Sequence, residues 1–261
     1  MGIVRLSLSS LAILLAYALG MAGSVIHADT PVVYLVGDST VRTLRDGHAG
    51  WGDSLTPWLP RENAPSVENR ARGGASSRSF IESGDWERIR TALRPGDVVL
   101  IQFGHNDQGS PKDGKASLNG TGDSTVTIKG KNSKKDTVVH TYGWYLNRYI
   151  DETLERKAIP VVITPVPRNV WRDGKLNTGS QVHVDWARAV ATSRHVPLLD
   201  LNQLVRTHYQ QSGSALVSKR YFRKGDETHT TLEGAAVTAR IAVSALRTDP
   251  DARVRQVFGG K

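Results

Sequence analysis

VVYLVGDST, residues 32–40, is a short apolar run that stops at a glycine, an acid and two hydroxyl-bearing residues. An apolar, β-branched run bounded by a turn signal predicts a buried strand of a parallel sheet. Open α/β sheets bind their ligands at the carboxyl ends of the strands, so Ser39 is expected at the mouth of a cleft. Serine is a nucleophile only where a base removes its proton and donors stabilise the oxyanion. The rest of the sequence must therefore supply both.

Four later runs also predict strands, and amphipathic segments separate them. The predicted strands cover residues 66–71, 97–103, 159–164 and 196–201. The predicted helices cover residues 85–93, with Asp85 as N-cap, then 141–157, 180–194 and 202–211, and a last helix up to residue 246 with Thr230 and Glu233 as capping box. Strands that alternate with helices predict an α/β domain with a five-stranded parallel sheet between two helical layers.

Two regions lack this pattern. Residues 108–139 are rich in Gly, Ser, Thr, Lys and Asp and are expected to form a long loop, in which the alternation at 125–128 favours a small hairpin strand. Residues 249–261 are polar and are expected to fray.

The first 28 residues have the layout of a secretory signal peptide. Arg5 precedes an apolar run at 11–19, and small residues follow up to Ala28. A retained membrane anchor is the alternative, although the run is short for a bilayer span. Cleavage would leave residues 29–261 as one domain, secreted or periplasmic, with no stable membrane association.

The charge of the chain points to anionic partners. Its formal net charge is +9, and removal of Arg5 with the leader leaves +8. Uronic-acid polymers, nucleic acid and membrane surfaces all fit a basic exported protein. The basic residues are scattered without a nucleic-acid signature, so we expect no nucleic-acid binding. The chain has no cysteine, which excludes disulfides and thiolate metal sites, and the histidines lack metalloprotease spacing, so neither a metal nor another cofactor is expected.

His229 is the best candidate for the base. Asp226 lies three residues earlier, where a carboxylate can accept from Nδ1 and leave Nε2 free for the serine proton. The positive end of the following helix disfavours an imidazolium, and Asp226 offsets that effect. Taken alone, an acid three residues before a histidine is also an ordinary helix start.

Three donors are available for an oxyanion. They are the backbone N–H groups of Ser39 and Gly74 and the side-chain amide of Asn106, which donates without titrating. Each cluster alone is more often a plain turn. The clusters around Ser39, Gly74 and Asn106 each follow a predicted strand and would converge at one edge of the sheet. Coincidence is therefore a weaker explanation.

At this point the sequence resembles the SGNH (GDSL-like) hydrolases. The matching blocks are Gly37-Asp38-Ser39-Thr40, Gly74, Gly104-His105-Asn106-Asp107 and Asp226-Glu227-Thr228-His229. The flanking segments 71–80, 140–146 and 164–169 are similar to the rhamnogalacturonan acetylesterase branch, and the similarity spans roughly residues 31–246.

The resemblance implies a flavodoxin-like α/β/α sandwich and metal-independent removal of acetyl groups from a pectic backbone through an acetyl-serine intermediate. Carried over by position, Ser39 would be the nucleophile, His229 the base and Asp226 its partner. Ser39, Gly74 and Asn106 would be the oxyanion donors. The long, lysine-rich segment after Asn106 departs from the pattern and puts the shape of the substrate in doubt.

Four residues on the expected active edge are candidates for contact with an acetylated, uronic-acid-containing polysaccharide. Trp51 and Trp171 could stack on sugar rings, although partly exposed packing tryptophans are an equal reading. Arg42 and Arg168 could bind a uronate carboxylate, because the planar guanidinium suits a bidentate partner.

Two other functions stay open. A lipolytic esterase or thioesterase would use the same serine, but its loops should be apolar, whereas these loops carry Gly, Lys, Asp and Trp. A non-catalytic glycan-binding envelope protein could keep the fold without turnover, although the presence of all four polar blocks disfavours it.

Overall fold

A computed structural model describes residues 30–44, 47–130, 135–177 and 181–259, and its centre is a five-stranded parallel sheet in the order β2-β1-β3-β6-β9. The strands are β1 Val32–Gly37, β2 Ser66–Asn69, β3 Val98–Gln102, β6 Ile159–Ile163 and β9 Leu198–Leu199. This is the flavodoxin-like order, with the first strand between the second and the third. The prediction of a parallel sheet is confirmed, with β9 shorter than expected.

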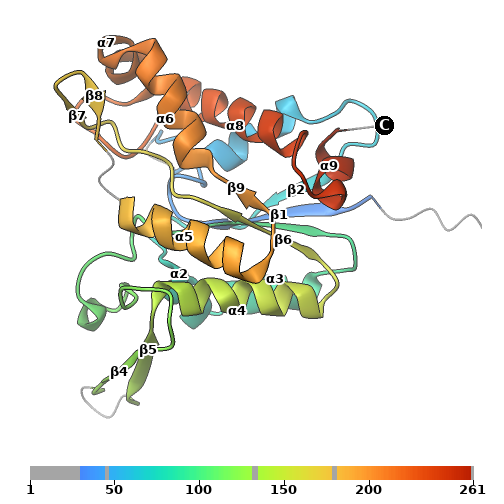
Figure 1. Ribbon diagram of the computed structural model, residues 1–261, viewed down its shortest axis with the longest axis vertical. Helices are drawn as coiled ribbons and strands as arrows, with labels where there is room; N and C mark the ends of the chain where they lie inside the picture. The colour runs from blue at the N-terminus through green and yellow to red at the C-terminus, as the bar shows by residue number, and fades with distance from the viewer. Residues whose placement is uncertain (1–29, 45–46, 131–134, 178–180, 260–261) are drawn as a thin grey trace, which may run out of the picture.

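Helices cover both faces of the sheet (Figure 1). Strand β1 is buried on both faces, and this burial explains why its sequence is apolar. Val33 and Leu35 belong to one buried cluster, and Val32, Tyr34 and Val36 to the other. The first cluster packs under α6 Leu201–Ser212, α8 Leu232–Leu246 and α9 Ala252–Gly259. The second packs under α2 Ser77–Glu82, α3 Asp85–Ala92, α4 Tyr142–Glu155 and α5 Gln181–Arg194. A strand buried on both faces needs apolar residues at every position.

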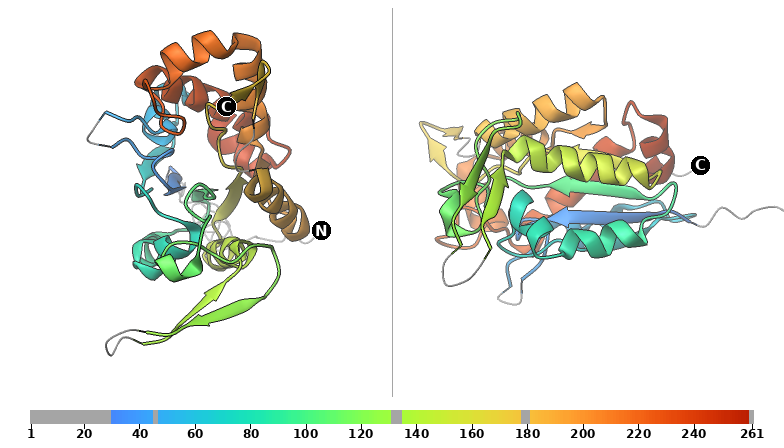
Figure 2. Two further views of the ribbon diagram at one scale, coloured as in Figure 1. Left: turned by 90° about the vertical axis from the view of Figure 1, so that its left-hand side faces the viewer. Right: turned by 90° about the horizontal axis from the view of Figure 1, so that it is seen from below.

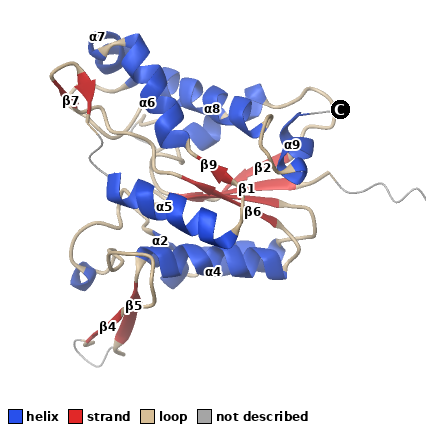
Figure 3. Cartoon of the chain, viewed as in Figure 1, coloured by secondary structure: helices blue, strands red, loops and turns tan. Residues whose placement is uncertain are grey.

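Several short elements lie in the connections between the main strands and helices. Hairpins β4–β5 and β7–β8 both lie at the carboxyl end of the sheet, and β4–β5 projects away from the body (Figures 1 and 2). The predicted strand at 125–128 is confirmed as β4, which pairs antiparallel with β5. The short elements are η1 Trp51–Ser54, η2 Thr56–Trp58, η3 Pro111–Asp113, β4 Thr125–Ile128, β5 Thr137–His140, β7 Trp171–Arg172, β8 Lys175–Leu176, α7 Ser214–Leu216 and η4 Val217–Tyr221. Figure 3 shows how much of the chain between β3 and α4 remains loop.

Helix α2 begins after the Gly73-Gly74 turn, with Ser76 as its N-cap, in a segment for which no element was predicted. Two expectations about helix caps are wrong. Asp85 is the first residue of α3, and Gly84 is the N-cap. The cap of α8 is Thr231, whose Oγ accepts from the N–H of Gly234 at 3.2 Å. Thr230 is engaged elsewhere, as described below.

The carboxyl-terminal segment does not fray over residues 252–259. These residues form α9, whose Val254, Val257 and Phe258 are buried against the core. Spacing of three and four residues places them on one helical face, so apolar burial outweighs the polar average of the segment.

The predicted signal peptide, residues 1–28, lies outside the described residues. Within the described part of the chain, the helices are too short or too polar to cross a bilayer.

Candidate active site

Ser39 lies in the turn after β1, and a chain of buried side-chain hydrogen bonds fixes this turn. Asp38 Oδ1 accepts from the backbone N–H and from Oγ1 of Thr40, each at 2.8 Å. Thr40 Oγ1 also accepts from Gln102 Nε2 at 2.7 Å, and Gln102 Oε1 accepts from Trp51 Nε1 at 3.0 Å. Buried groups on β3 and η1 therefore hold the loop that presents the serine.

His229 meets this serine from the other end of the chain. Its Nε2 lies 2.9 Å from Ser39 Oγ, although 190 positions separate the two residues. A bridge joins their two loops: Ala49 N–H donates to the Thr230 carbonyl at 3.0 Å, and Thr230 Oγ1 donates to the Ala49 carbonyl at 2.7 Å. The structure thus brings the predicted serine and histidine together, and the two hydrogen bonds between Thr230 and Ala49 join the loops that carry them.

Asp226 holds the other side of the imidazole. Its Oδ2 lies 2.9 Å from His229 Nδ1, and its Oδ1 accepts from the backbone N–H groups of Thr228 at 2.7 Å and His229 at 2.8 Å. Burial alone would raise the pKa of Asp226, but these hydrogen bonds outweigh it and lower the pKa from 3.8 to about 2. An ionised Asp226 favours the tautomer with hydrogen on Nδ1, which leaves Nε2 as the acceptor facing Ser39.

His48 is a member of the site that the sequence did not reveal. Its Nε2 lies 3.2 Å from Asp226 Oδ2, the oxygen that also faces His229. The two imidazole rings are 4.7 Å apart between centroids and tilted by 42°. His48 stands in a glycine-flanked loop without a motif, so only its position nine residues after Ser39 could have suggested it.

The three predicted oxyanion donors keep unused hydrogen-bonding capacity. The backbone N–H groups of Ser39 and Gly74 make no hydrogen bond to another described residue. Asn106 Nδ2 donates to the carbonyl of Ala75 at 3.0 Å. A primary amide has two N–H groups, so this bond orients Asn106 and leaves one hydrogen for a ligand. The geometry is that of three donors with free capacity.

Gly74 needs to be glycine, and it has an unexpected neighbour. Its φ is +71°, in the left-handed region, and a Cβ added there would lie 3.3 Å from Lys115 Nζ. The Lys115 carbonyl accepts from Ser76 Oγ at 2.5 Å, and the next carbonyl, of Ala116, accepts from Arg78 Nη1 at 3.1 Å. The lysine-rich loop is therefore anchored, and it places one ammonium group beside Gly74.

Asp107 stabilises the segment that follows Gly74. It is buried, and its carboxylate accepts from Ser77 N–H at 3.2 Å and from Ser77 Oγ at 2.5 Å. Burial raises the pKa of Asp107 to about 6, against the opposing effect of the Ser77 bonds. The residue acts on the Gly74 loop through Ser77, which fits a scaffold role.

The expectation that Trp51 stacks on a sugar ring is wrong. Its side chain is 1% exposed, and its Nε1 is bonded to Gln102 in the core. Trp171 keeps part of its surface exposed, with Nε1 bonded to Asn169 Oδ1 at 2.8 Å. Only Trp171 can still offer a ring face to a ligand.

The two predicted arginines differ in their surroundings. The Nε atom of Arg168 is buried without a hydrogen-bond partner among the described residues. The pKa of His105 is lowered, mainly by burial. Asp38 acts in the opposite direction, and the positive charge of the nearby Arg168 adds to the lowering. Arg168 therefore lies near His105 with one N–H donor unused. Arg42 is half exposed and donates to the carbonyl of Asn69.

One group among the described residues could hold a metal ion, and it coincides with the site just built. His48, Asp226 and His229 each offer a ligand atom within 4.8 Å of the others. An ion there would occupy the nitrogen and oxygen atoms that the serine mechanism needs.

Residues 35–237 match the model of the GDSL-like lipase/acylhydrolase family. The chain belongs to this family. Its reaction class is therefore the hydrolysis of carboxylic esters.

This GDSL-family esterase is also similar to individual proteins. It is 31% identical over 216 residues to a rhamnogalacturonan acetylesterase of Emericella nidulans, covering 82% of this chain and 84% of that protein. It is 29% identical over 231 residues to the rhamnogalacturonan acetylesterase RhgT of Bacillus subtilis, covering 82% and 88%. The crystal structure of B. subtilis YxiM superposes with a TM-score of 0.68 at 25% identity, covering 84% of this chain and 56% of that one.

Proposed function

We propose that this esterase removes O-acetyl groups from an acidic polysaccharide of the rhamnogalacturonan type through an acetyl-serine intermediate. The observation that carries the proposal is the contact of Ser39 Oγ with His229 Nε2 at 2.9 Å, with Asp226 on the far side of the ring. A hydroxyl, a base and an orienting carboxylate in this order are the parts that acyl transfer to serine requires.

In the first half of the reaction, Ser39 Oγ attacks the acetyl carbonyl carbon while His229 Nε2 takes the hydroxyl proton. The negative oxygen that forms is held by the N–H groups of Ser39 and Gly74 and by Asn106 Nδ2. Asp226 stabilises the imidazolium. The tetrahedral species collapses when the sugar oxygen leaves with the proton from His229, and Ser39 keeps the acetyl group.

The second half repeats these steps with water. His229 removes a proton from a water molecule, whose oxygen attacks the acetyl-serine carbonyl. Collapse returns this proton to Ser39 Oγ and releases acetic acid, which ionises in solution to acetate and a proton. The same three donors hold the second oxyanion.

The acidic polysaccharide is supported by charge and by similarity. The chain has a formal net charge of +9, and Arg168 brings a buried, unpartnered Nε to the neighbourhood of the site. Two relatives at 31% and 29% identity are rhamnogalacturonan acetylesterases by name. A guanidinium is suited to the carboxylate of a uronic acid in such a chain.

We also propose that residues 1–28 direct export, so that the enzyme works in the periplasm or the medium. A polysaccharide substrate lies outside the cytoplasm of a cell that degrades it. Fractionation of the expressing cells and the mass of the mature amino terminus test this. A full-length chain in the cytoplasm would contradict it.

The activity is tested by acetate release from acetylated rhamnogalacturonan, xylan and chitin fragments, with p-nitrophenyl acetate as a general ester. The wild type should release acetate fastest from rhamnogalacturonan, and Ser39→Ala should release none above the uncatalysed rate. A faster rate on p-nitrophenyl octanoate than on the acetate would favour the lipolytic alternative. Absence of turnover on every ester would favour a glycan-binding protein.

A further inference from the structure

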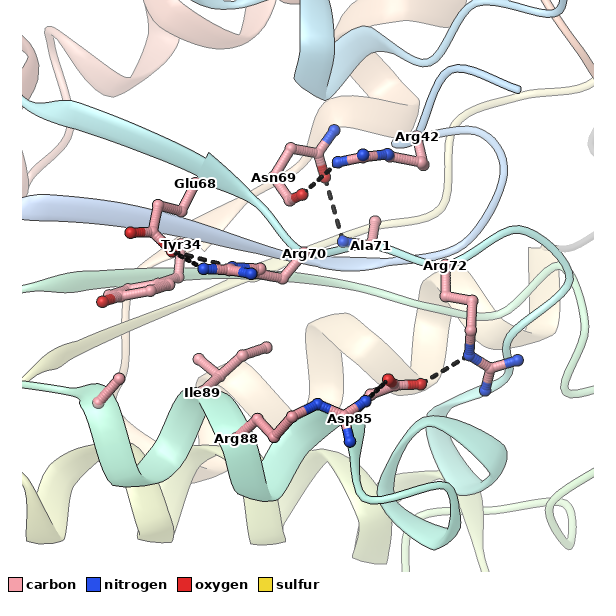
Figure 4. A pocket seen from close by; sticks show the side chains of 11 residues that line it. Tyr34, Arg42, Glu68, Asn69, Arg70, Ala71, Arg72, Asp85, Arg88 and Ile89 are labelled. Atoms are coloured by element: carbon pink, nitrogen blue, oxygen red, sulfur yellow. Dashed lines mark hydrogen bonds and ion pairs between the residues drawn. The ribbon is translucent and has the colours of Figure 1, made fainter. Parts of the chain in front are cut away.

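A basic groove runs beside the outer strand of the sheet. It has a volume of about 760 Å³ and lies between β2 and α3 (Figure 4). Four arginines and two acids line it, so the formal charge of its walls is positive. These charged residues are Arg42, Glu68, Arg70, Arg72, Asp85 and Arg88.

The groove adjoins the esterase site through the backbone. Arg72 N–H donates to the carbonyl of Gly37 at 3.0 Å, and Arg42 N–H donates to the carbonyl of Asp38 at 3.0 Å. Arg42 is three residues after Ser39, and Arg72 is two residues before Gly74. Because β2 pairs in parallel with β1, one end of the groove borders the turns that carry the nucleophile and an oxyanion donor.

Three of the guanidinium groups are held by hydrogen bonds and still keep unused N–H donors. Arg72 Nε donates to Asp85 Oδ2 at 2.7 Å, and its side chain remains 42% exposed. Arg42 donates to the Asn69 carbonyl and remains 46% exposed. Arg70 is paired with Glu68 through Nε at 2.9 Å and remains 59% exposed. A guanidinium has five N–H donors, so each arginine keeps donors for an anion in the groove.

Charged side chains on an edge strand can also serve to block pairing with another molecule. That role requires charge alone and no cavity. Here the arginines come from three separate segments, the loop after β1, the loop after β2 and helix α3, and they line one groove (Figure 4). A shared cavity beside the reacting turn fits ligand binding better than protection of the edge.

We propose that this groove binds uronate carboxylates of the polysaccharide chain, outside the acetylated residue that occupies the Ser39 site. The inference rests on the proposed function and names where the acidic part of the substrate lies. Arg42 and Arg70 are the carboxylate contacts, and Glu68 restrains Arg70 and lowers the positive charge of the groove.

Binding is measured by calorimetry on Ser39→Ala, with an unacetylated galacturonate hexamer as probe and the same hexamer with its carboxyls reduced to alcohols as the uncharged control. Adding either Arg42→Gln or Arg70→Gln should weaken binding of the charged hexamer about three- to fivefold, since an exposed ion pair contributes up to about 1 kcal/mol. Glu68→Gln should tighten it about twofold or more by freeing Arg70. Both effects should shrink in high salt.

Arg240→Gln is the matched control, because it removes the same charge from an exposed residue of α8. It should leave binding as in Ser39→Ala. Equal weakening by Arg240→Gln and the groove variants, or no tightening by Glu68→Gln, would overturn the inference.

The proposed function can fail separately. If the wild type deacetylates rhamnogalacturonan while the groove variants bind the charged hexamer normally, only the groove assignment is wrong. If the wild type releases no acetate from any polysaccharide yet the hexamer binds through Arg42 and Arg70, only the reaction is wrong.

Discussion

His48 Nε2 lies 3.2 Å from Asp226 Oδ2, the same carboxylate oxygen that stands 2.9 Å from His229 Nδ1. Two imidazoles therefore share one oxygen of a carboxylate whose other oxygen is filled by backbone N–H groups. The site is thus a serine, a histidine and an aspartate with a second histidine that fixes the aspartate.

His48 should act as a positioning residue. We expect His48→Gln to lower kcat for p-nitrophenyl acetate by about three- to tenfold, because Asp226 loses a partner that restrains it, an interaction of about 1 kcal/mol. KM should change little, since the neighbours of His48 in the site are Asp226 and His229, through which it acts on the reaction. The exposed His195 has φ +50°, which asparagine tolerates, so His195→Asn is the control and should retain wild-type kcat. A change confined to KM would contradict this role.

Asp226→Asn should keep the fold and lower kcat by about 10²–10⁴, because the imidazole loses both its orientation and the charge that stabilises its protonated form. Circular dichroism and steady-state esterase kinetics on the same preparation check both parts. Unchanged kinetics in a folded variant would refute the assignment.

Asp226 should also make stability depend on pH. Its folded pKa is lowered to about 2, below the ordinary 3.8, so its contribution is present above pH 3.8 and is lost as the pH falls through 2. Urea unfolding should find the wild type about 1–2 kcal/mol more stable than Asp226→Asn near pH 6, with the gap narrowing below pH 4. A gap that widens in acid would contradict the sign.

Asn106→Ala should lower kcat by about 10²–10³, the usual effect of removing one oxyanion donor. Its bond to the Ala75 carbonyl also disappears, so the melting temperature must be measured together with kcat. Asn147→Ala removes an amide of the same kind from a half-buried position of α4, where Oδ1 accepts from Arg194 Nη1 at 3.4 Å, and should retain kcat. Similar kcat values for the two variants would remove Asn106 from the oxyanion site.

Lys115→Met should raise KM for acetylated rhamnogalacturonan more than for p-nitrophenyl acetate, because it removes the ammonium beside Gly74. Lys112→Met lies on the same loop, where Lys112 is exposed, and should leave both values near those of the wild type. If both variants change KM equally, the effect is one of overall charge.

Trp51→Phe should cost stability and leave sugar preference alone. The substitution leaves Gln102 Oε1 buried without its donor, which costs about 1–3 kcal/mol. Urea unfolding measures the loss, and the ratio of kcat/KM for xylan and rhamnogalacturonan should stay constant. A large change in that ratio with unchanged stability would restore Trp51 as a sugar contact.

Most of the sheet could be predicted from the sequence, because a strand buried on both faces must be apolar at each position, as residues 32–36 are. The hairpin strand at 125–128 followed from its alternation. The ends of helices were harder. The threonine that caps α8 is Thr231, because the hydroxyl of Thr230 donates to the carbonyl of Ala49, a residue remote in the chain.

The amino-acid sequence by itself determined the apolar segments that form the strands, the serine turn and the acid–histidine pair, since these depend on residues close together along the chain. The tertiary structure alone decided that Ser39 and His229 touch, that His48 joins Asp226, that Trp51 is buried and that α9 packs on the core. Local patterns report burial and turns, whereas a contact between distant segments depends on how the whole chain packs. For that reason the basic groove beside β2 appears only when the sheet is assembled.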